Sequence, residues 1–186
     1  GNIQYLSSFK TEIIDTGQFS EIEVDSFFDR TASAIKDLTT NSGINPSDIV
    51  SIGNSGTGGG IFLLDKSGRS LRNGISSMDT RSEDLIKKWQ TEGIDNYSKT
   101  FTNMWSGQTI PLLYWLKENE KENFKKINKL LFCKDWIKFN LTGKYSTDYT
   151  DVSNAGLIDL NSRQYSRQLY SLYGMDEIPD FLPKIN

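Results

Sequence analysis

Apolar residues at helical spacing mark the region from residue 24 to residue 43. A repeat of three to four residues predicts an amphipathic helix with one face turned toward a core. Asp25 or Ser26 is suited to cap its first turn, and Gly43 is suited to end it. The apolar stripe consists of Phe27, Phe28, Ala32, Ile35 and Leu38.

Four later segments also favour helices, and three of them end at a glycine. Their ranges are 80–93, 109–127, 129–143 and 162–174. The segment 109–127 forms one helix or two, and Pro111 is tolerated there because a first helical turn leaves its N–H groups unpaired in any case. The spacing places four aromatic side chains in the core, namely Trp115, Phe132, Trp136 and Phe139.

Short runs rich in strand formers predict the β structure. Their ranges are 2–14, 48–52, 60–65 and 70–77. The dipeptide Gly1–Asn2 is typical of a hairpin turn, and its first strand would precede the chain. A strand with no partner is an exposed edge, so we expect the chain to be a fragment cut at its N-terminus. Helices alternating with strands predict one α/β domain.

Composition excludes several kinds of chemistry. The 186 residues carry a net charge of −3 with both signs spread along the chain, which argues against nucleic acid as the main partner. The chain has no histidine, which excludes Ser-His-Asp and Cys-His triads and leaves a zinc site only carboxylate ligands. Its one cysteine, Cys133, is expected to be a buried thiol. The absence of any intrachain disulfide suits a reducing, cytoplasmic setting.

The glycine-rich stretch "GTGGG" at 56–60 raises the question of a phosphate-binding loop. A Walker loop needs lysine after its last glycine, where this chain has Gly59. The dinucleotide fingerprint needs glycine at the position of Ile61. Both motifs also open a helix, whereas the next residues predict a strand. The glycines instead indicate a strand end where a ligand or a neighbouring strand approaches the backbone closely, or simply a glycine-bulged hairpin.

Several motifs together resemble the FGGY family of carbohydrate kinases, and most closely its xylulose and L-xylulose kinase branch. The resemblance covers nearly the whole chain and departs from the family pattern at two positions. Leu112 stands where the family signature prefers lysine, and Ser77 stands where many members have tryptophan. The motifs are "ISSMDTR" (75–81), "GQTIPLLYWLKEN" (107–119), "KDWIKFNLTGKYSTDYTDVSNAGLIDL" (134–160) and "LPKI" (182–185).

The resemblance implies a ribonuclease H-like, actin-like fold in which a mixed sheet is flanked by helices. Residues 1–186 would be most of the N-terminal, sugar-binding domain, lacking its first strand and the C-terminal nucleotide-binding domain. ATP and Mg²⁺ would serve the full-length enzyme, with neither bound tightly to this part. The catalytic base would lie outside the chain, and the fragment alone would be inactive. The alternatives are a non-catalytic sugar-binding or regulatory domain and an actin-like interaction domain.

The same resemblance implies which residues face a sugar, expected to be a ketopentose such as xylulose or L-xylulose. Asp79 and Arg81 stand two apart, so on an extended loop both project to one side and could hydrogen-bond sugar hydroxyls; the alternative is an exposed ion pair or a helix N-cap before Ser82. Trp105 would stack on the sugar or pack in the core. The full set is Gly58, Gly59, Asp79, Arg81, Trp105 and Gln108.

Two further expectations concern acidic residues and partners. Asp148 and Asp151 invite comparison with paired catalytic or metal-binding carboxylates, but their surroundings favour turn structure, in which the side chains accept backbone hydrogen bonds. No metal ligand is therefore assigned. The expected partner is a small-molecule sugar, with neither nucleic acid nor a membrane, and a homodimer stays open.

Overall fold

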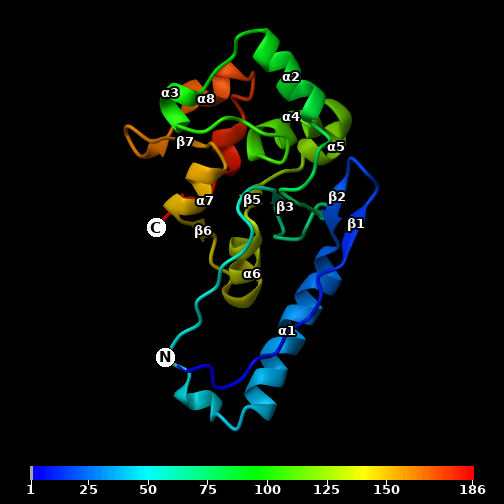
Figure 1. Cartoon of the computed structure of the whole chain (residues 1–186), viewed down its shortest axis with the longest axis vertical. Helices are drawn as coiled ribbons and strands as arrows, with labels where there is room; N and C mark the ends of the chain where they lie inside the picture. Colours follow the sequence, from blue (N-terminus) through cyan, green and yellow to red (C-terminus); the bar gives the residue numbers. More distant parts are fainter. Residues whose placement is uncertain (1) are drawn as a thin grey trace.

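The computed structural model describes residues 2–186 and shows short strands at the centre with helices around them (Figure 1). Two 3-10 turns, Pro46–Asp48 and Ile178–Phe181, supplement the helices. Within residues 2–186 no helix combines the length and apolar character needed to cross a bilayer. The helices are α1 (Val24–Asn41), α2 (Glu83–Thr91), α3 (Tyr97–Thr100), α4 (Thr109–Asn119), α5 (Lys121–Phe124), α6 (Cys133–Thr142), α7 (Tyr149–Asn154) and α8 (Arg167–Leu172).

The strands form small sheets of both parallel and antiparallel type. The first sheet is antiparallel in the order β1–β2–β4, and β3 pairs antiparallel with β5. A parallel pair, β6–β9, and an antiparallel pair, β7–β8, lie nearer the C-terminus. The strands are β1 (Ile13–Asp15), β2 (Ser20–Ile22), β3 (Phe62–Leu64), β4 (Gly74–Ile75), β5 (Lys129–Leu131), β6 (Ser146–Thr147), β7 (Ile158–Asp159), β8 (Gln164–Tyr165) and β9 (Lys184–Ile185).

The β3–β5 pair divides the interior into two clusters. Because successive side chains on a strand point to opposite faces, Leu63 and Leu130 enter one cluster while Phe62 and Leu131 enter the other. All four side chains are at most 3% exposed. The two strands therefore have no solvent-facing side, and helices must cover both faces.

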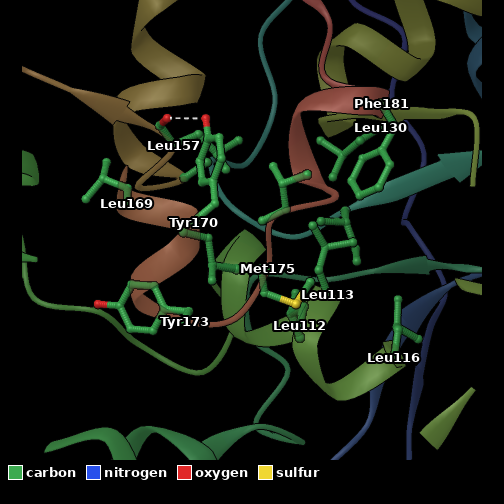
Figure 2. Close-up of a cluster of buried hydrophobic side chains, with 14 of the residues drawn as sticks. Leu112, Leu113, Leu116, Leu130, Leu157, Leu169, Tyr170, Tyr173, Met175 and Phe181 are labelled. Carbon is green, nitrogen blue, oxygen red and sulfur yellow. Dashed lines mark hydrogen bonds between the residues drawn. The ribbon is translucent and has the colours of Figure 1, made fainter. Parts of the chain in front are cut away.

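The larger cluster is built on α4 and α8 (Figure 2). Leu112, Leu113 and Leu116 of α4 are completely buried, as the apolar run in that helix predicts. Tyr170 of α8 is buried as well, and its hydroxyl donates a 2.6 Å hydrogen bond to the carbonyl of Leu157. A buried tyrosine hydroxyl needs such a partner, and this bond ties α8 to the turn after α7.

The smaller cluster joins α1 and α6 to the other face of β3. The Trp136 ring stacks on Phe27 of α1 with ring centroids 5.9 Å apart, and it lies 5.3 Å from the ring of Phe62. Figure 1 shows α1 as a long helix on the side away from α2 and α8. Burial of Phe132 and Trp136 confirms the predicted core positions, and Trp115 and Phe139 pack against the clusters from partly buried positions.

Several predicted helices are confirmed with small changes at their ends. The first runs over Val24–Asn41, but its cap is Glu23, whose carboxylate accepts hydrogen bonds from the N–H groups of Asp25 and Ser26. Gly43 follows the helix with a φ of +74°, the left-handed backbone that favours glycine after a helix end. The segment 109–127 contains two helices, α4 and α5.

Several strand and helix predictions were wrong in whole or in part, including the start of the predicted helix 162–174, where Gln164–Tyr165 form β8. Residues 129–131 were expected to be helical but form β5, because pairing with β3 outweighs the helical pattern of a short apolar run. The predicted strand 48–52 is absent, and Val50 is 96% exposed. Of the predicted strand 2–14 only Ile13 and Ile14 are paired. No segment within residues 2–186 pairs with the remainder. Gly1, where the hairpin turn was expected, lies outside the described residues.

Replacing Gly107 by alanine tests how closely two backbone segments approach each other. The Gly107 carbonyl accepts a 2.9 Å hydrogen bond from the N–H of Gly60, and a Cβ on Gly107 would overlap the carbonyl of Ser77. We expect Gly107→Ala to lower the free energy of unfolding by about 1–3 kcal/mol, the usual cost of overpacking, in urea denaturation. Gly53→Ala is the control, because nothing lies within 4 Å of its Cβ position. Equal effects of the two substitutions would contradict the close approach.

Candidate functional site

The glycine stretch before β3 is shaped by its own backbone angles and by its neighbours. Gly59 and Gly60 have φ values of +75° and +67°, which other residues adopt at a cost. A Cβ on Gly60 would also overlap the carbonyl of Ile75, whose strand lies against Ile61. Because β3 follows at once, no helix N-terminus points at a phosphate here. The bare backbone serves close packing of chain segments and leaves a strand end without side chains.

Three other segments meet this strand end. The Cβ position of Gly59 lies 3.3 Å from a ring carbon of Trp105 and 3.2 Å from the Cβ of Ser77. A Cβ on Gly58 would overlap the side-chain nitrogen of Asn154. The structure therefore brings the predicted residues Gly58, Gly59 and Trp105 into one place, with Trp105 half-buried. Asn154 belongs to the same place and was not predicted as a site residue, although it lies in the motif 134–160.

Gln108 lies beneath this surface rather than on it. Its side chain is fully buried, and its Nε2 donates a 2.8 Å hydrogen bond to the backbone carbonyl of Asn154. The Cβ position of Gly156 lies only 3.0 Å from the same nitrogen. Among the described residues, the Gln108 Oε1 has no hydrogen-bonding partner. Direct contact between Gln108 and a sugar stays a prediction, whereas its bond to the turn at Asn154 is observed.

Asp79 is buried with all its acceptor positions filled. Its Oδ1 accepts hydrogen bonds from the backbone N–H and the Nε of Arg81, at 3.0 and 2.8 Å. Its Oδ2 accepts from the N–H of Ser20 at 2.7 Å and from a terminal nitrogen of Arg81 at 2.8 Å. A carboxylate offers about four acceptor sites. In this arrangement Asp79 holds the loop 76–81 against β2.

Arg81 completes a buried charge network behind that loop. Its side chain is 1% exposed, so the pair with Asp79 is not the exposed ion pair that the sequence left open. The guanidinium also donates to Glu21 at 2.6 Å and lies 4.6 and 4.9 Å from the rings of Phe19 and Trp115. Burial lowers the pKa of Arg81, but the bonds to Asp79 and Glu21 outweigh burial and raise it. The helix N-cap alternative also fails, since no side chain caps α2.

A second cation, largely buried, lies near the glycine stretch and was missed in the sequence. The Lys134 Nζ lies 2.8 Å from Asp135 Oδ1, 2.8 Å from Asp151 Oδ2 and 3.1 Å from Asp148 Oδ2. Burial opposes the charge of Lys134, yet its contacts with the three carboxylates raise its pKa. Two of the partners, Asp148 and Asp151, are distant from Lys134 in sequence, and the Cβ position of Gly56 lies 3.0 Å from the Lys134 N–H nitrogen.

Of the two acidic residues of the "TDYTD" segment, Asp148 has the structural role that the sequence favoured, whereas among the described residues the Asp151 carboxylate contacts Lys134 and accepts no backbone hydrogen bond. Asp148 caps α7 by accepting a 3.1 Å hydrogen bond from the N–H of Asp151. Burial raises the pKa of Asp151 against the opposing effect of Lys134. Within residues 2–186 no group of three or more His, Cys, Asp or Glu side chains is arranged to hold a metal ion.

Cys133 is a buried thiol, which confirms the sequence interpretation. Its side chain is 8% exposed, and burial raises its pKa above the ordinary thiol value. A thiol in this state is mostly protonated and is a poor nucleophile at neutral pH.

Comparison with solved structures identifies the class of fold. A xyloylose kinase from Brucella ovis superposes with a TM-score of 0.85 and 28% identity, covering 95% of this chain and 36% of that chain. A gluconate kinase from Lactobacillus acidophilus gives a TM-score of 0.84 and 27% identity, covering 95% and 35%. These are carbohydrate kinases of the ribonuclease H-like, actin-like class, so the predicted fold is confirmed.

The sequence comparison then gives the family. The chain belongs to the FGGY family of carbohydrate kinases, whose N-terminal domain model matches residues 2–186. A probable L-xylulose kinase of Pasteurella multocida is 34% identical over 93% of this chain and 36% of its own length. The L-xylulose/3-keto-L-gulonate kinase of Escherichia coli is 34% identical over 82% and 31%. The chain therefore spans about a third of the length of these curated relatives.

Removing the charge of Lys134 should destabilise the protein strongly. We expect Lys134→Met to lower the free energy of unfolding at neutral pH by about 3–5 kcal/mol, because buried carboxylates lose their cation. Protonation of Asp151, whose pKa is raised by burial, removes part of that unpaired charge, so the loss should shrink as the pH falls toward about 4. Urea denaturation across this pH range measures both effects.

The control for this prediction is Lys87→Met. Lys87 is 63% exposed and pairs with Glu83 and Asp84 on the surface of α2. Exposed ion pairs contribute about 0–1 kcal/mol, so this change should be small. Similar losses for the two lysine variants would show that the Lys134 cluster contributes no more than a surface pair.

Proposed function

We propose that this chain is the sugar-holding domain of an ATP-dependent carbohydrate kinase, which transfers the γ-phosphate of ATP to a sugar hydroxyl. The observation that carries the proposal is the match of residues 2–186 to the N-terminal domain of the FGGY family. The activity belongs to a protein longer than this chain, since the relatives named for it are about three times as long. We therefore expect no phosphorylation by residues 1–186 alone.

The meeting point of the glycine stretch with Trp105 and Asn154 is the proposed sugar wall. Backbone without side chains lets a small polyol lie close to the strand end. An aromatic face packs against the C–H groups of a sugar, and carboxamides both donate to and accept from hydroxyls. Gly58, Gly59 and Trp105 would face the sugar in this arrangement. Asp79, Arg81 and Gln108 would act from beneath by holding the loops that form the wall.

The phosphoryl transfer itself draws on groups that this chain does not supply. In such reactions the acceptor hydroxyl attacks the γ-phosphorus in line, and Mg²⁺ with backbone N–H groups stabilises the transferring charge. We assign no residue of this chain to Mg²⁺, ATP or the catalytic base. The share of this domain is to orient the sugar hydroxyl and to exclude water from one side.

The proposed substrate class is a ketopentose such as xylulose or L-xylulose. The relatives from Pasteurella multocida and Escherichia coli carry these names, the second together with 3-keto-L-gulonate. A gluconate kinase is structurally as similar as a xyloylose kinase, so aldonates belong in the same test. A cytoplasmic location fits such phosphorylation, because ATP and the phosphorylated sugar are both used there.

Sugar-dependent release of ADP tests the proposed function. A coupled assay with MgATP and a panel of pentuloses, polyols and aldonates is run on residues 1–186 and on the complete open reading frame. We expect release from the complete protein only, with a pentulose as the best substrate. Release from neither protein would favour a non-catalytic sugar-binding or actin-like interaction domain. Release from residues 1–186 would contradict the assignment of the missing groups to the rest of the protein.

Replacing Asp79 tests whether the loop that it holds supports the sugar wall. Asp79→Ala removes the acceptor of four hydrogen bonds that hold the loop 76–81. In the complete protein we expect the KM for the sugar to rise far more than the KM for ATP. Steady-state kinetics with each substrate varied in turn make the comparison, with circular dichroism to check folding. A folded variant with an unchanged sugar KM would remove Asp79 and its loop from the site.

A further inference from the structure

The Asn154 side chain occupies the space that a side chain on residue 58 would need. A Cβ on Gly58 would overlap the Asn154 Nδ2 and would lie 3.1 Å from its carboxamide carbon. The missing side chain on the strand end is thus replaced by a side chain from the end of α7. Gly58 therefore accommodates the Asn154 carboxamide, which explains physically why this position carries glycine although its φ is not in the left-handed region.

The Asn154 carboxamide is exposed and is free to bind a ligand. No group among residues 2–186 is hydrogen-bonded to its side-chain amide, in contrast to the occupied carboxylate of Asp79. A carboxamide carries one acceptor oxygen and two N–H donors, so it suits a polyhydroxy compound whose hydroxyls do both. Because it lies beside Gly58, this carboxamide is part of the sugar wall defined above.

The backbone that carries Asn154 is firmly held. Its carbonyl accepts the 2.8 Å bond from the buried Gln108, and the next turn passes through Gly156 with a φ of +68°. The N–H of Leu157 donates 3.0 Å to the carbonyl of Val152, which closes this turn. Binding of a ligand by this side chain therefore requires no further ordering of the backbone, which favours its use for specificity.

Gly59, the neighbouring glycine, also lies against side chains from other segments. The Cβ position of Gly59 is flanked by Trp105 and Ser77, both from other segments. Each of two successive glycines thus faces a side chain supplied from elsewhere, a carboxamide at Gly58 and an indole at Gly59. A polar group beside an aromatic face is the combination that sugar hydroxyls and C–H groups require.

We propose that Asn154 is a specificity-determining residue whose carboxamide hydrogen-bonds a hydroxyl of the bound sugar. The absence of a side chain at Gly58 leaves the space that this carboxamide occupies. The inference rests on the proposed function of a carbohydrate kinase domain. It adds a named ligand-binding side chain and gives Gln108 a positioning role, because the buried Gln108 side chain bonds the backbone carbonyl of Asn154.

The test uses the complete open reading frame with L-xylulose and D-xylulose as sugars. Asn154→Ala should raise the KM of the better sugar about five-fold, as expected for losing one neutral hydrogen bond, and leave the KM for ATP and kcat nearly unchanged. Asn119→Ala is the matched control. Asn119 is also an exposed asparagine near a helix end, and its Nδ2 bonds only the carbonyl of Trp115. We expect that control to leave the KM for the sugar unchanged.

A second variant tests the shared space directly. Gly58→Ser should displace the Asn154 side chain and raise the sugar KM by itself. Once Asn154 is alanine, the same change has nothing to displace, so the two effects should not add. Additive effects would show that the two positions act independently and would overturn the steric part of the inference.

The outcomes separate the inference from the function on which it rests. Sugar-dependent ADP release by the unaltered protein, with an unchanged sugar KM in Asn154→Ala, would overturn the role of Asn154 alone. The absence of sugar-dependent release from the unaltered protein would overturn the proposed function and this inference together. A sugar KM that rises in Asn154→Ala but not in Asn119→Ala would support both.

Discussion

The pair of strands β3 and β5 is the element on which the rest of this structure depends. Its three residue pairs expose neither face, so α4 and α8 must cover one side while α1 and α6 cover the other. Because Gly58–Gly60 run directly into β3, the strand end is placed by the same packing that forms the two clusters. The site is therefore attached to the most buried part of the chain and needs few contacts of its own to stay in position.

Buried ion pairs also determine which segments lie against each other in this packing. Arg81 joins Asp79 and Glu21, and Arg72 extends the network from Glu21 to Glu120 at the end of α4. Desolvated charges contribute little net stability compared with apolar residues of similar volume, but breaking one pair costs several kcal/mol. A loop that leaves its native position would break such a pair. The network therefore destabilises displaced loop conformations more than it stabilises the native conformation. The Arg81 network restricts the loop 76–81 in this way.

Glycine has a second use at the site, besides its freedom in φ. At Gly58 and Gly107 the angles are ordinary, and the decisive fact is what a Cβ would meet, a carboxamide in one case and a carbonyl in the other. Chain segments far apart in the sequence can then approach each other closely. The surface that results is assembled from four segments, each contributing one or two groups, and this explains why no single motif describes it.

The sequence by itself determined the features that depend on neighbouring residues. The helix Val24–Asn41, the glycine after it and the motifs of the FGGY family were all predictable, because a helical stripe and a short motif are local patterns. Tertiary structure decided the rest. Residues 129–131 form a strand because they pair with β3. Lys134 contacts carboxylates of residues up to 17 positions away in the sequence. Which polar groups are free for a ligand and which are occupied depends on contacts between distant segments, and those contacts exist only once the chain has folded.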